Sequence, residues 1–297
     1  MNVLVIGSNG QLGFELMRAS WPAGASPRGL AHAALDVRDL AAVEAVIAAE
    51  RWDLVVNAAA YTQVDRAESE RDMAFAVNRD GARNVAGACG RRAIPVIYIS
   101  TDYVFDGAKP TPYVEDDPVA PINAYGESKA AGEAAVRQAN PRHIIIRASW
   151  LYGVHGQNFV KTMLRLAAAR EEIAVVDDQR GSPTSATDLA HVITVVAHRL
   201  AAGQGQWGKF HFCGAGDTTW FGFAQAIFAD PDARLVRQPR LRPIPTSGYP
   251  TAARRPANSR LDCGRIESAY GIRRPAWRAS LRVMLAELSS RTTSNGA

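Results

Sequence analysis

The feature that most constrains the fold is a short apolar run that ends at a glycine loop close to the first residue. The sequence VLVIGSNGQLG places Gly7, Gly10 and Gly13 between a strand predicted at 3–7 and a helix predicted at 11–19. Glycines at these places let the backbone turn, approach a pyrophosphate at the helix N-terminus, and bring the helix close to the strand. A plain tight turn can carry the same glycines, but a strand–turn–helix unit favours dinucleotide binding.

Short apolar runs alternate with helical patterns through the rest of the first half. Further strands are predicted at 53–59, 94–101 and 142–149, and helices at 39–50 and 69–88. These strands lack polar alternation, which is typical of parallel strands buried on both faces. The pattern predicts an α/β fold with a Rossmann-type doubly wound parallel sheet in residues 1–150.

The second half has a different character. After residue 150 the regular rhythm weakens, and glycine, proline and arginine become more frequent. We expect residues 151–288 to form mainly a smaller substrate-binding lobe, with some later segments returning to the first domain. The last stretch, 289–297, has no apolar anchor and is predicted to be a disordered tail.

Composition and charge narrow the classes of function. The net charge is +5, and arginines crowd the C-terminal part without interleaved aromatic residues, so no nucleic-acid partner is expected. A diphosphate ligand accounts for some of these arginines. Apolar runs are too short for a membrane span and no signal-peptide pattern is found, which predicts a cytoplasmic protein without a membrane partner. Three widely separated cysteines argue against a disulfide framework or a cysteine-rich metal site.

The stretch YGESK places a tyrosine and a lysine on one face of a predicted helix. By themselves, Tyr125 and Lys129 are also compatible with an ordinary exposed turn. Carbonyl reduction by a nicotinamide needs a proton donor, and a free tyrosine with a pKa of about 10 exchanges protons poorly at neutral pH. A lysine one turn away stabilises the phenolate and can hold the nicotinamide ribose. Thr101, at the end of the predicted strand 94–101, can orient the carbonyl oxygen.

Several motifs in order carry a resemblance to a known family. The glycine loop, NAAA (57–60), STDYVF (100–105) and YGESK together resemble the extended short-chain dehydrogenase/reductase family, whose members act largely on nucleotide sugars. Longer stretches, among them NAAAYTQVDRAESE, RASWLYG, VVDDQRGSPTSATDLA and YPTAARRPANSRLD, resemble the dTDP-4-dehydrorhamnose reductases within that family. This resemblance implies reduction of the 4-keto group of dTDP-4-dehydro-L-rhamnose by NADPH or NADH.

The same resemblance implies roles for particular residues. Thr101, Tyr125 and Lys129 are the implied catalytic set, and Asp102 and Trp150 are implied at the sugar. The predicted cofactor contacts are Gly7, Gly10, Gln11, Leu12, Gly13, Asp36, Val37, Ala59, Ala60, Tyr61, Thr62, Tyr125 and Lys129. For substrate binding we add Arg255, Asn258 and Ser259, whose donors suit an anionic or hydroxylated ligand.

The second strand and the cofactor preference are less defined. The acidic residue that usually binds the adenosine ribose, about twenty positions after the glycines, is missing, and the first carboxylate is Asp36. Arg28 or His32 could instead face a 2′-phosphate, so the choice between NADPH and NADH is left open.

A metal site is a further implication of the resemblance. In some members, glutamates on three helices hold a magnesium ion at a dimer interface. Glu15 and Glu287 match two of these positions, but Thr187, beside Asp188, takes the third. The sequence therefore argues against a metal-bridged dimer and leaves monomer and homodimer open.

Two other readings remain. One is an epimerase or 4,6-dehydratase of the same family, and the other is a non-catalytic regulatory subunit of this fold, such as the one that partners methionine adenosyltransferase. Dehydratases of the group carry an Asp–Glu pair after the threonine, whereas Tyr103 follows Asp102 here. Intact Thr101, Tyr125 and Lys129 argue against a non-catalytic subunit.

Overall fold

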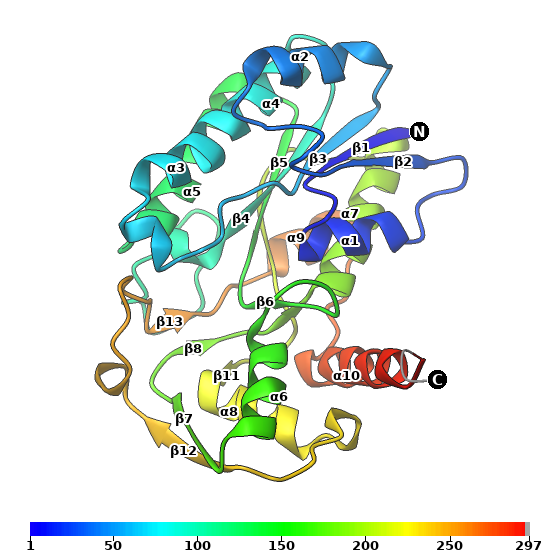
Figure 1. Cartoon of the computed structure of the whole chain (residues 1–297). Coiled ribbons are helices and arrows are strands. Elements are labelled where there is room, and N and C mark those ends of the chain that lie inside the picture. The colour runs from blue at the N-terminus through cyan, green and yellow to red at the C-terminus, as the bar shows by residue number, and fades with distance from the viewer. Residues whose placement is uncertain (295–297) are drawn as a thin grey trace.

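A six-stranded parallel sheet forms the centre of the molecule, with strand order β10-β5-β4-β3-β1-β2 (Figure 1). The computed structural model describes residues 1–294, the last three of them by backbone alone. The strands are β1 (Asn2–Ile6), β2 (Ser26–Leu30), β3 (Leu54–Asn57), β4 (Val96–Thr101), β5 (His143–Ala148) and β10 (Gly208–Phe212). The predicted α/β fold with a doubly wound parallel sheet is confirmed.

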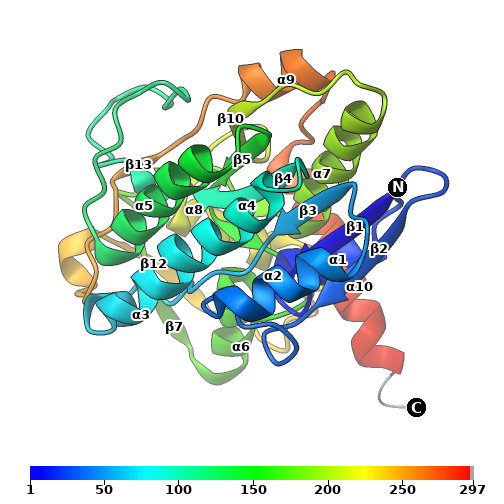
Figure 2. The ribbon, with the colours of Figure 1, turned by 90° about the horizontal axis from the view of Figure 1, so that it is seen from above.

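Helices cover both faces of this sheet (Figure 2). One face carries α1 (Gln11–Arg18), α7 (Ala186–Ala201) and α9 (Gly264–Tyr270), and the other carries α2 (Leu40–Ala49), α4 (Ala82–Gly90) and α5 (Ala124–Ala139). Along β1, Val3 and Val5 belong to the first apolar core, whereas Leu4 and Ile6 belong to the second. Because successive side chains of a strand point to opposite faces, both sets are buried. This arrangement explains why the strands lack polar alternation.

The regular elements of the first half follow the sequence prediction with one interruption. The strands predicted at 3–7, 53–59, 94–101 and 142–149 correspond to β1, β3, β4 and β5, and the helix predicted at 39–50 corresponds to α2. The helix predicted at 69–88 is instead divided into α3 (Arg71–Phe75), a π-helical turn (Ala76–Gly81) and α4. Such turns are frequent at functional sites.

The second half builds a smaller lobe, drawn below the main sheet in Figure 1. Its helices and main strand pair are α6 (Phe159–Ala169), α8 (Trp220–Ala229), α10 (Trp277–Ser294), β7 (Glu172–Val176) and β12 (Arg240–Ile244). Short strands join it to the sheet domain: β6 (Leu151–Tyr152), β8 (Arg180–Gly181), β9 (Thr184–Ser185), β11 (Thr218–Thr219) and β13 (Asn258–Ser259). Phe223 and Trp277 lie in the apolar core of this lobe.

The C-terminal helix is longer than the sequence suggested. α10 continues to Ser294, so the predicted disordered tail is wrong for residues 289–294, and residues 295–297 lie outside the described part. Near its end, Arg291 lies 3.9 Å from Glu287 one turn earlier and also over the ring of Phe14 on α1. Within residues 1–294, none of the helices is long and apolar enough to cross a membrane.

Candidate functional site

The three residues predicted to be catalytic lie together at the carboxyl edge of the sheet, where open α/β sheets bind ligands. Thr101 ends β4, and Tyr125 lies in the first turn of α5. The nearby Thr101 hydroxyl lowers the pKa of Tyr125, against the larger effect of burial. Lys129 follows one turn later, and its Nζ donates to the Ile99 carbonyl at 2.6 Å. The same ammonium lies 4.1 Å from the ring centroid of Tyr98.

Burial sets the protonation of these groups. Burial and then the nearby charge of Asp102 raise the pKa of Tyr125, so its phenol stays protonated at neutral pH. Burial lowers the pKa of Lys129 to about 7, against the opposing effect of Glu133. The described contacts of Lys129 go to Ile99 and Tyr98, so its effect on the pKa of Tyr125 stays a prediction.

Asp102 places a carboxylate beside this pair. Its Oδ1 accepts a hydrogen bond from the Thr101 hydroxyl at 2.9 Å, whereas its buried Oδ2 has no hydrogen-bond partner among the described residues. Burial raises the pKa of Asp102 to about 6, and hydrogen bonds from Ser259 and Thr101 oppose that rise. A buried acceptor without a partner in the protein suits a donor on a ligand.

The raised pKa of Asp102 predicts how stability changes with pH. The folded protein binds this proton more tightly than the unfolded chain, so stability contributed by the carboxyl is lost as pH rises from about 4 to about 6. We expect Asp102→Asn to raise the free energy of unfolding at about pH 8 by up to ~3 kcal/mol, and to bring no gain at about pH 4. Denaturant unfolding at the two pH values measures this difference.

Asp106 supplies a control of opposite sign. The hydrogen bond from Tyr113 lowers the pKa of this exposed carboxyl, so its contribution to stability is present at neutral pH and lost in acid. Asp106→Asn should therefore lower stability at about pH 8 and have little effect in acid. Equal pH trends for the two variants would contradict the assignment of Asp102.

The glycine loop leaves room for a ligand at the N-terminus of α1. Gly7 has a φ of 84°, and a Cβ at Gly13 would lie 2.1 Å from the Gly7 carbonyl oxygen, so packing requires both glycines. A Cβ at Gly10 would meet only the Gly7 carbonyl oxygen, at 3.4 Å, on an otherwise open side. Because the first turn of α1 carries no acidic residue, the loop fits a pyrophosphate.

The other predicted cofactor residues lie at the ends of neighbouring strands. Gln11 follows the loop at the start of α1, Leu12 and Val37 are buried in the apolar cores, and Ala59, Ala60, Tyr61 and Thr62 follow β3. Leu12 is thus restricted to backbone contacts with a ligand. A buried amide, Asn78 in the π-helical turn, accepts from the Tyr61 N–H and donates to the Ser128 hydroxyl on α5. Sequence analysis missed this tie between the two cofactor segments.

The end of β2 carries no carboxylate. β2 ends at Leu30, and Asp36 forms a bidentate ion pair with Arg38, which lowers the pKa of Asp36 to about 2. Arg28, in the middle of β2, pairs with Glu50 at the end of α2. Among the basic residues considered for a 2′-phosphate, His32 lies two residues after the end of β2, whereas Arg38 is already paired with Asp36.

Trp150 lies just after β5 in a strained backbone conformation. Its φ of 48° falls in the left-handed region that non-glycine residues rarely adopt. Its ring stacks on Trp220 at a centroid distance of 3.6 Å, and a Cβ at Gly181 would come within 2.5 Å of it. Trp220, missed from the sequence, donates from its indole to Gln179 and so fixes the stack.

The three residues suggested for anion binding have different surroundings. Arg255 forms a two-point ion pair with Asp65, with nitrogen–oxygen distances of 2.8 and 3.1 Å. The Asn258 amide donates to the carbonyls of Lys109 and Thr111 and accepts from Arg260, so its bonds hold the loop together and leave no donor for a substrate. Ser259 instead lowers the pKa of Asp102.

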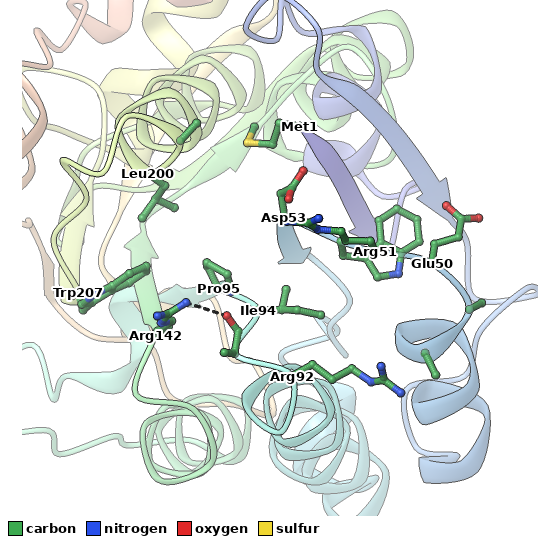
Figure 3. Close-up of a pocket in the computed structure, with 15 residues that line it drawn as sticks. Met1, Glu50, Arg51, Asp53, Arg92, Ile94, Pro95, Arg142, Leu200 and Trp207 are labelled. Carbon is green, nitrogen blue, oxygen red and sulfur yellow. Dashed lines mark hydrogen bonds between the residues drawn. The ribbon is translucent and has the colours of Figure 1, made fainter.

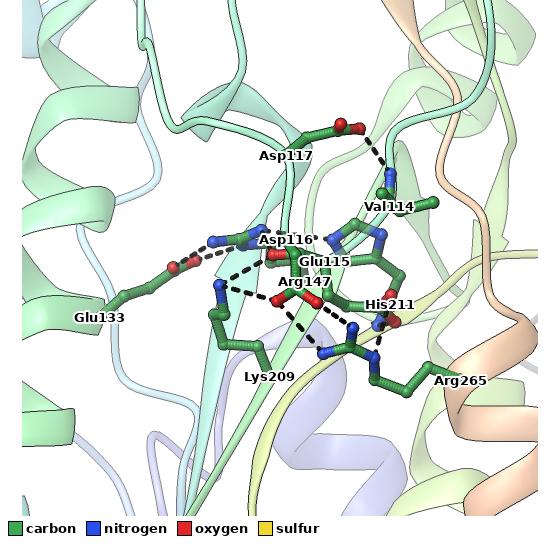
Figure 4. A network of polar contacts seen from close by, with 9 residues as sticks. All are labelled: Val114, Glu115, Asp116, Asp117, Glu133, Arg147, Lys209, His211 and Arg265. Carbon is green, nitrogen blue, oxygen red and sulfur yellow. Dashed lines mark hydrogen bonds and ion pairs between the residues drawn. The ribbon is translucent and has the colours of Figure 1, made fainter.

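A buried ion-pair network holds α5 against the sheet (Figure 4). Arg147 on β5 binds both carboxylate oxygens of Glu133, at 2.8 and 2.6 Å, and the Ser100 hydroxyl donates to the same carboxylate at 2.6 Å. Glu133 lies one turn after Lys129. These bonds therefore fix the helix that carries Tyr125 and Lys129 relative to β4.

A cavity of about 880 Å³ lies at the opposite, amino edge of the strands (Figure 3). Arg51, Arg92 and Arg142 line it, close to the C-terminal ends of α2 and α7. Arg142 donates to the Ala93 carbonyl at 3.0 Å, as basic residues near helix ends commonly do. None of the predicted catalytic residues lines this cavity.

The residues considered for magnesium do not fit the ion. Arg18 lies 3.5 Å from Glu15 and 2.9 Å from Glu287, so a guanidinium already neutralises both carboxylates. Asp188 accepts from the Ser280 hydroxyl, and Thr187 offers only a hydroxyl group. Within residues 1–294 no cluster of three or more histidine, cysteine, aspartate or glutamate side chains is placed to hold a metal.

Comparisons with known proteins agree with this geometry. The model of the family described as the RmlD substrate binding domain matches residues 1–290. The chain is 45% identical over 284 residues to a dTDP-4-dehydrorhamnose reductase of Sinorhizobium fredii, covering 95% of this chain and 96% of that protein. It is 42% identical over 301 residues to one of Burkholderia thailandensis, covering 98% and 100%. A solved Bacillus anthracis dTDP-4-dehydrorhamnose reductase in complex with NADP superposes with a TM-score of 0.90 at 39% identity, covering 96% and 99%.

Proposed function

Because this chain belongs to the dTDP-4-dehydrorhamnose reductase family, described as the RmlD substrate binding domain, we propose that it reduces dTDP-4-dehydro-L-rhamnose to dTDP-L-rhamnose with NADPH or NADH. It is an oxidoreductase that acts on the 4-keto group. The observation that carries this proposal is the position of Thr101, Tyr125 and Lys129 at one edge of the sheet, on the side of the glycine loop.

Each catalytic residue has one task in this reaction. A bound nicotinamide would supply the hydride to the carbonyl carbon. Tyr125, protonated at neutral pH, donates its phenolic proton to the carbonyl oxygen. The Thr101 hydroxyl, which donates to Asp102 in the ligand-free site, turns to that oxygen and orients it. Lys129 holds the nicotinamide ribose and stabilises the phenolate that remains. Transfer of one hydride and one proton converts the ketone into an alcohol.

The sugar is held by residues around this group. The free Oδ2 of Asp102 accepts from a sugar hydroxyl, and Trp150, backed by Trp220, packs against the sugar ring. Arg255, which is paired with Asp65, binds the anionic part of the substrate. Asn258 supports the loop that carries Ser259.

The two domains bind different ligands in this proposal. Residues 1–150, with the returning β10 and α7, bind the cofactor, and most of 151–288 binds the nucleotide sugar. We infer a monomer or a homodimer without a bridging metal, since Arg18 pairs with both glutamates. No nucleic-acid or membrane partner is expected, and the cytoplasmic location stays a prediction from sequence.

A coupled assay tests the reaction. dTDP-4-dehydro-L-rhamnose is generated enzymatically in situ, and the loss of NADPH absorbance and the formation of dTDP-L-rhamnose are followed together. Equal amounts of NADPH consumed and product formed support a reductase. Sugar conversion without NADPH loss would indicate an epimerase or dehydratase, and no conversion at all would indicate a non-catalytic subunit.

Both nicotinamide cofactors should be accepted. No carboxylate follows β2 to repel a 2′-phosphate, and Asp36 is already paired with Arg38. We expect kcat/KM for NADH and NADPH to differ by less than about 10³-fold, or roughly 4 kcal/mol. Steady-state kinetics with each cofactor measure the ratio, and a larger preference for NADH would contradict the assignment of the β2 end.

Lys129→Met should affect both cofactor binding and rate. Methionine fills a similar apolar volume but removes the cation assigned to the nicotinamide ribose. We expect a fall in kcat of about 10²-fold together with a raised Kd for NADPH, measured by fluorescence titration. Lys109→Met, which removes a cation paired with Asp117, is the matched control and should leave the Kd unchanged. An unchanged Kd for Lys129→Met would remove Lys129 from the ribose.

A further inference from the structure

Two of the three cysteines meet in the interior of the protein. Cys213 directly follows β10, and Cys263 precedes α9, but their Sγ atoms lie only 3.6 Å apart. Both thiols are buried and reduced, and both approach the carbonyl oxygen of Leu261, at 3.8 and 3.7 Å. Their separation in sequence hid this contact from sequence analysis.

The surroundings of the pair distinguish its two sulfurs. The Arg274 guanidinium has Nη1 3.7 Å from the Cys213 Sγ and donates from Nε to Glu267. The hydrogen bond from Cys263 and the charge of Arg274 lower the pKa of Cys213, while the neighbouring Cys213 and burial raise the pKa of Cys263. Cys213 is therefore the more readily ionised of the two thiols, although its burial opposes the effects of Cys263 and Arg274.

Cys89 differs from Cys213 in its surroundings. It is buried among apolar residues of α4, and burial raises its pKa to about 12. No second sulfur or basic group is recorded beside it among the described residues. Cys89 thus provides an internal comparison within the same chain.

The pair connects two segments of the candidate site. Cys263 lies four residues after Ser259 of β13, and Ser259 lowers the pKa of Asp102. Gly214, the residue after Cys213, packs against the carbonyl of Pro183, two residues after Gly181, which packs against Trp150. A covalent bond between the sulfurs would therefore restrain both sides of the sugar position.

We propose that Cys213 and Cys263 form a modification site, at which a two-electron oxidant of the peroxide class closes an internal disulfide in the folded protein. The Cys213 thiolate attacks one peroxide oxygen, giving a sulfenic acid and releasing hydroxide, which takes up a proton to form water. The Cys263 sulfur then attacks the sulfenic sulfur, the S–S bond forms, and a second water leaves. Two thiols are oxidised and one hydrogen peroxide is reduced to two waters.

The geometry requires only small movements for this step. Shortening the sulfur separation from 3.6 Å to about 2 Å is shared between two side chains. Hydrogen peroxide is a small oxidant, which suits a buried pair. Reduction by dithiothreitol reverses the step.

The test treats the full-length folded protein with hydrogen peroxide, blocks the remaining thiols in denaturant, and counts them by mass spectrometry. We expect the three free thiols to fall to one, Cys89, with a cross-linked peptide that joins Cys213 to Cys263. Cys89→Ser should still lose two thiols, whereas Cys213→Ser should lose none. Three thiols remaining in the treated wild type, or a cross-link that contains Cys89, would overturn the proposal without relying on any variant.

Kinetics after removal of peroxide test the connection to the sugar position. The cross-linked wild type should show a rise in KM for the nucleotide sugar of about fivefold, reversed by dithiothreitol, with an unchanged Kd for NADPH. Cys213→Ser, treated in the same way, should keep its KM. An unchanged KM in the cross-linked protein would overturn the connection between the pair and the site.

Discussion

Tyr125→Phe is expected to lower kcat for dTDP-4-dehydro-L-rhamnose by on the order of 10²-fold or more, as for the loss of a general acid. The phenol of Tyr125 has a raised pKa and lies within reach of the Thr101 hydroxyl, so it is the proton donor that this site offers. Phenylalanine keeps the ring and its edge contact with Tyr103. The Kd for NADPH should change little, because no cofactor contact of consequence is removed.

Two measurements separate this loss from general damage to the site. The Tyr103 ring lies beside Tyr125, with a centroid distance of 5.9 Å. Tyr103→Phe removes only the hydroxyl of this neighbouring ring and should keep kcat within about tenfold of wild type. Thermal unfolding of both variants should occur close to the wild-type temperature. If Tyr125→Phe turned over at the wild-type rate, another group would have to supply the proton.

Local sequence signals were enough to predict the sheet domain and to suggest a catalytic set, which stays a prediction. β1, α1 and the glycine loop are adjacent in sequence, and each carries its own periodicity and turn chemistry. The pair Tyr125 and Lys129 needs only the spacing of a helical turn. Such features depend on neighbours along the chain, which a sequence displays directly.

Features that depend on distant segments were not predictable in the same way. Glu133 and Arg147 are opposite charges on different elements, and nothing in the sequence tells that they meet in the interior. Trp220 stacks on Trp150 only because the start of α8 lies beside the residue two positions after β5. The same reason explains the contact between Cys213 and Cys263, which spacing alone had argued against.

The ion-pair partners of the basic residues in the second lobe could also be identified only from the structure. Many form ion pairs with acidic neighbours, for example Arg180 with Asp217 and Arg242 with Glu172. Arg254 differs, since its exposed guanidinium has no ion-pair partner within the described residues. Its backbone carbonyl accepts from Asn123, the N-cap of the helix that carries Tyr125. Arg254 therefore joins Arg255 as a candidate for the diphosphate.

A free 4-keto-6-deoxyhexose without the nucleotide should be reduced far more slowly than the dTDP-linked sugar. The reason is that the diphosphate contacts of the second lobe help to place the carbonyl against the hydride, and the free sugar forgoes that binding energy. If these contacts contribute roughly 4 kcal/mol, kcat/KM should differ by about 10³-fold, measured by steady-state kinetics. Arg254→Gln should lower kcat/KM for the dTDP-linked sugar only, and Arg234→Gln, a similar charge loss beyond α8, should change neither. Similar kcat/KM values for both sugars would show that the basic lobe serves another partner.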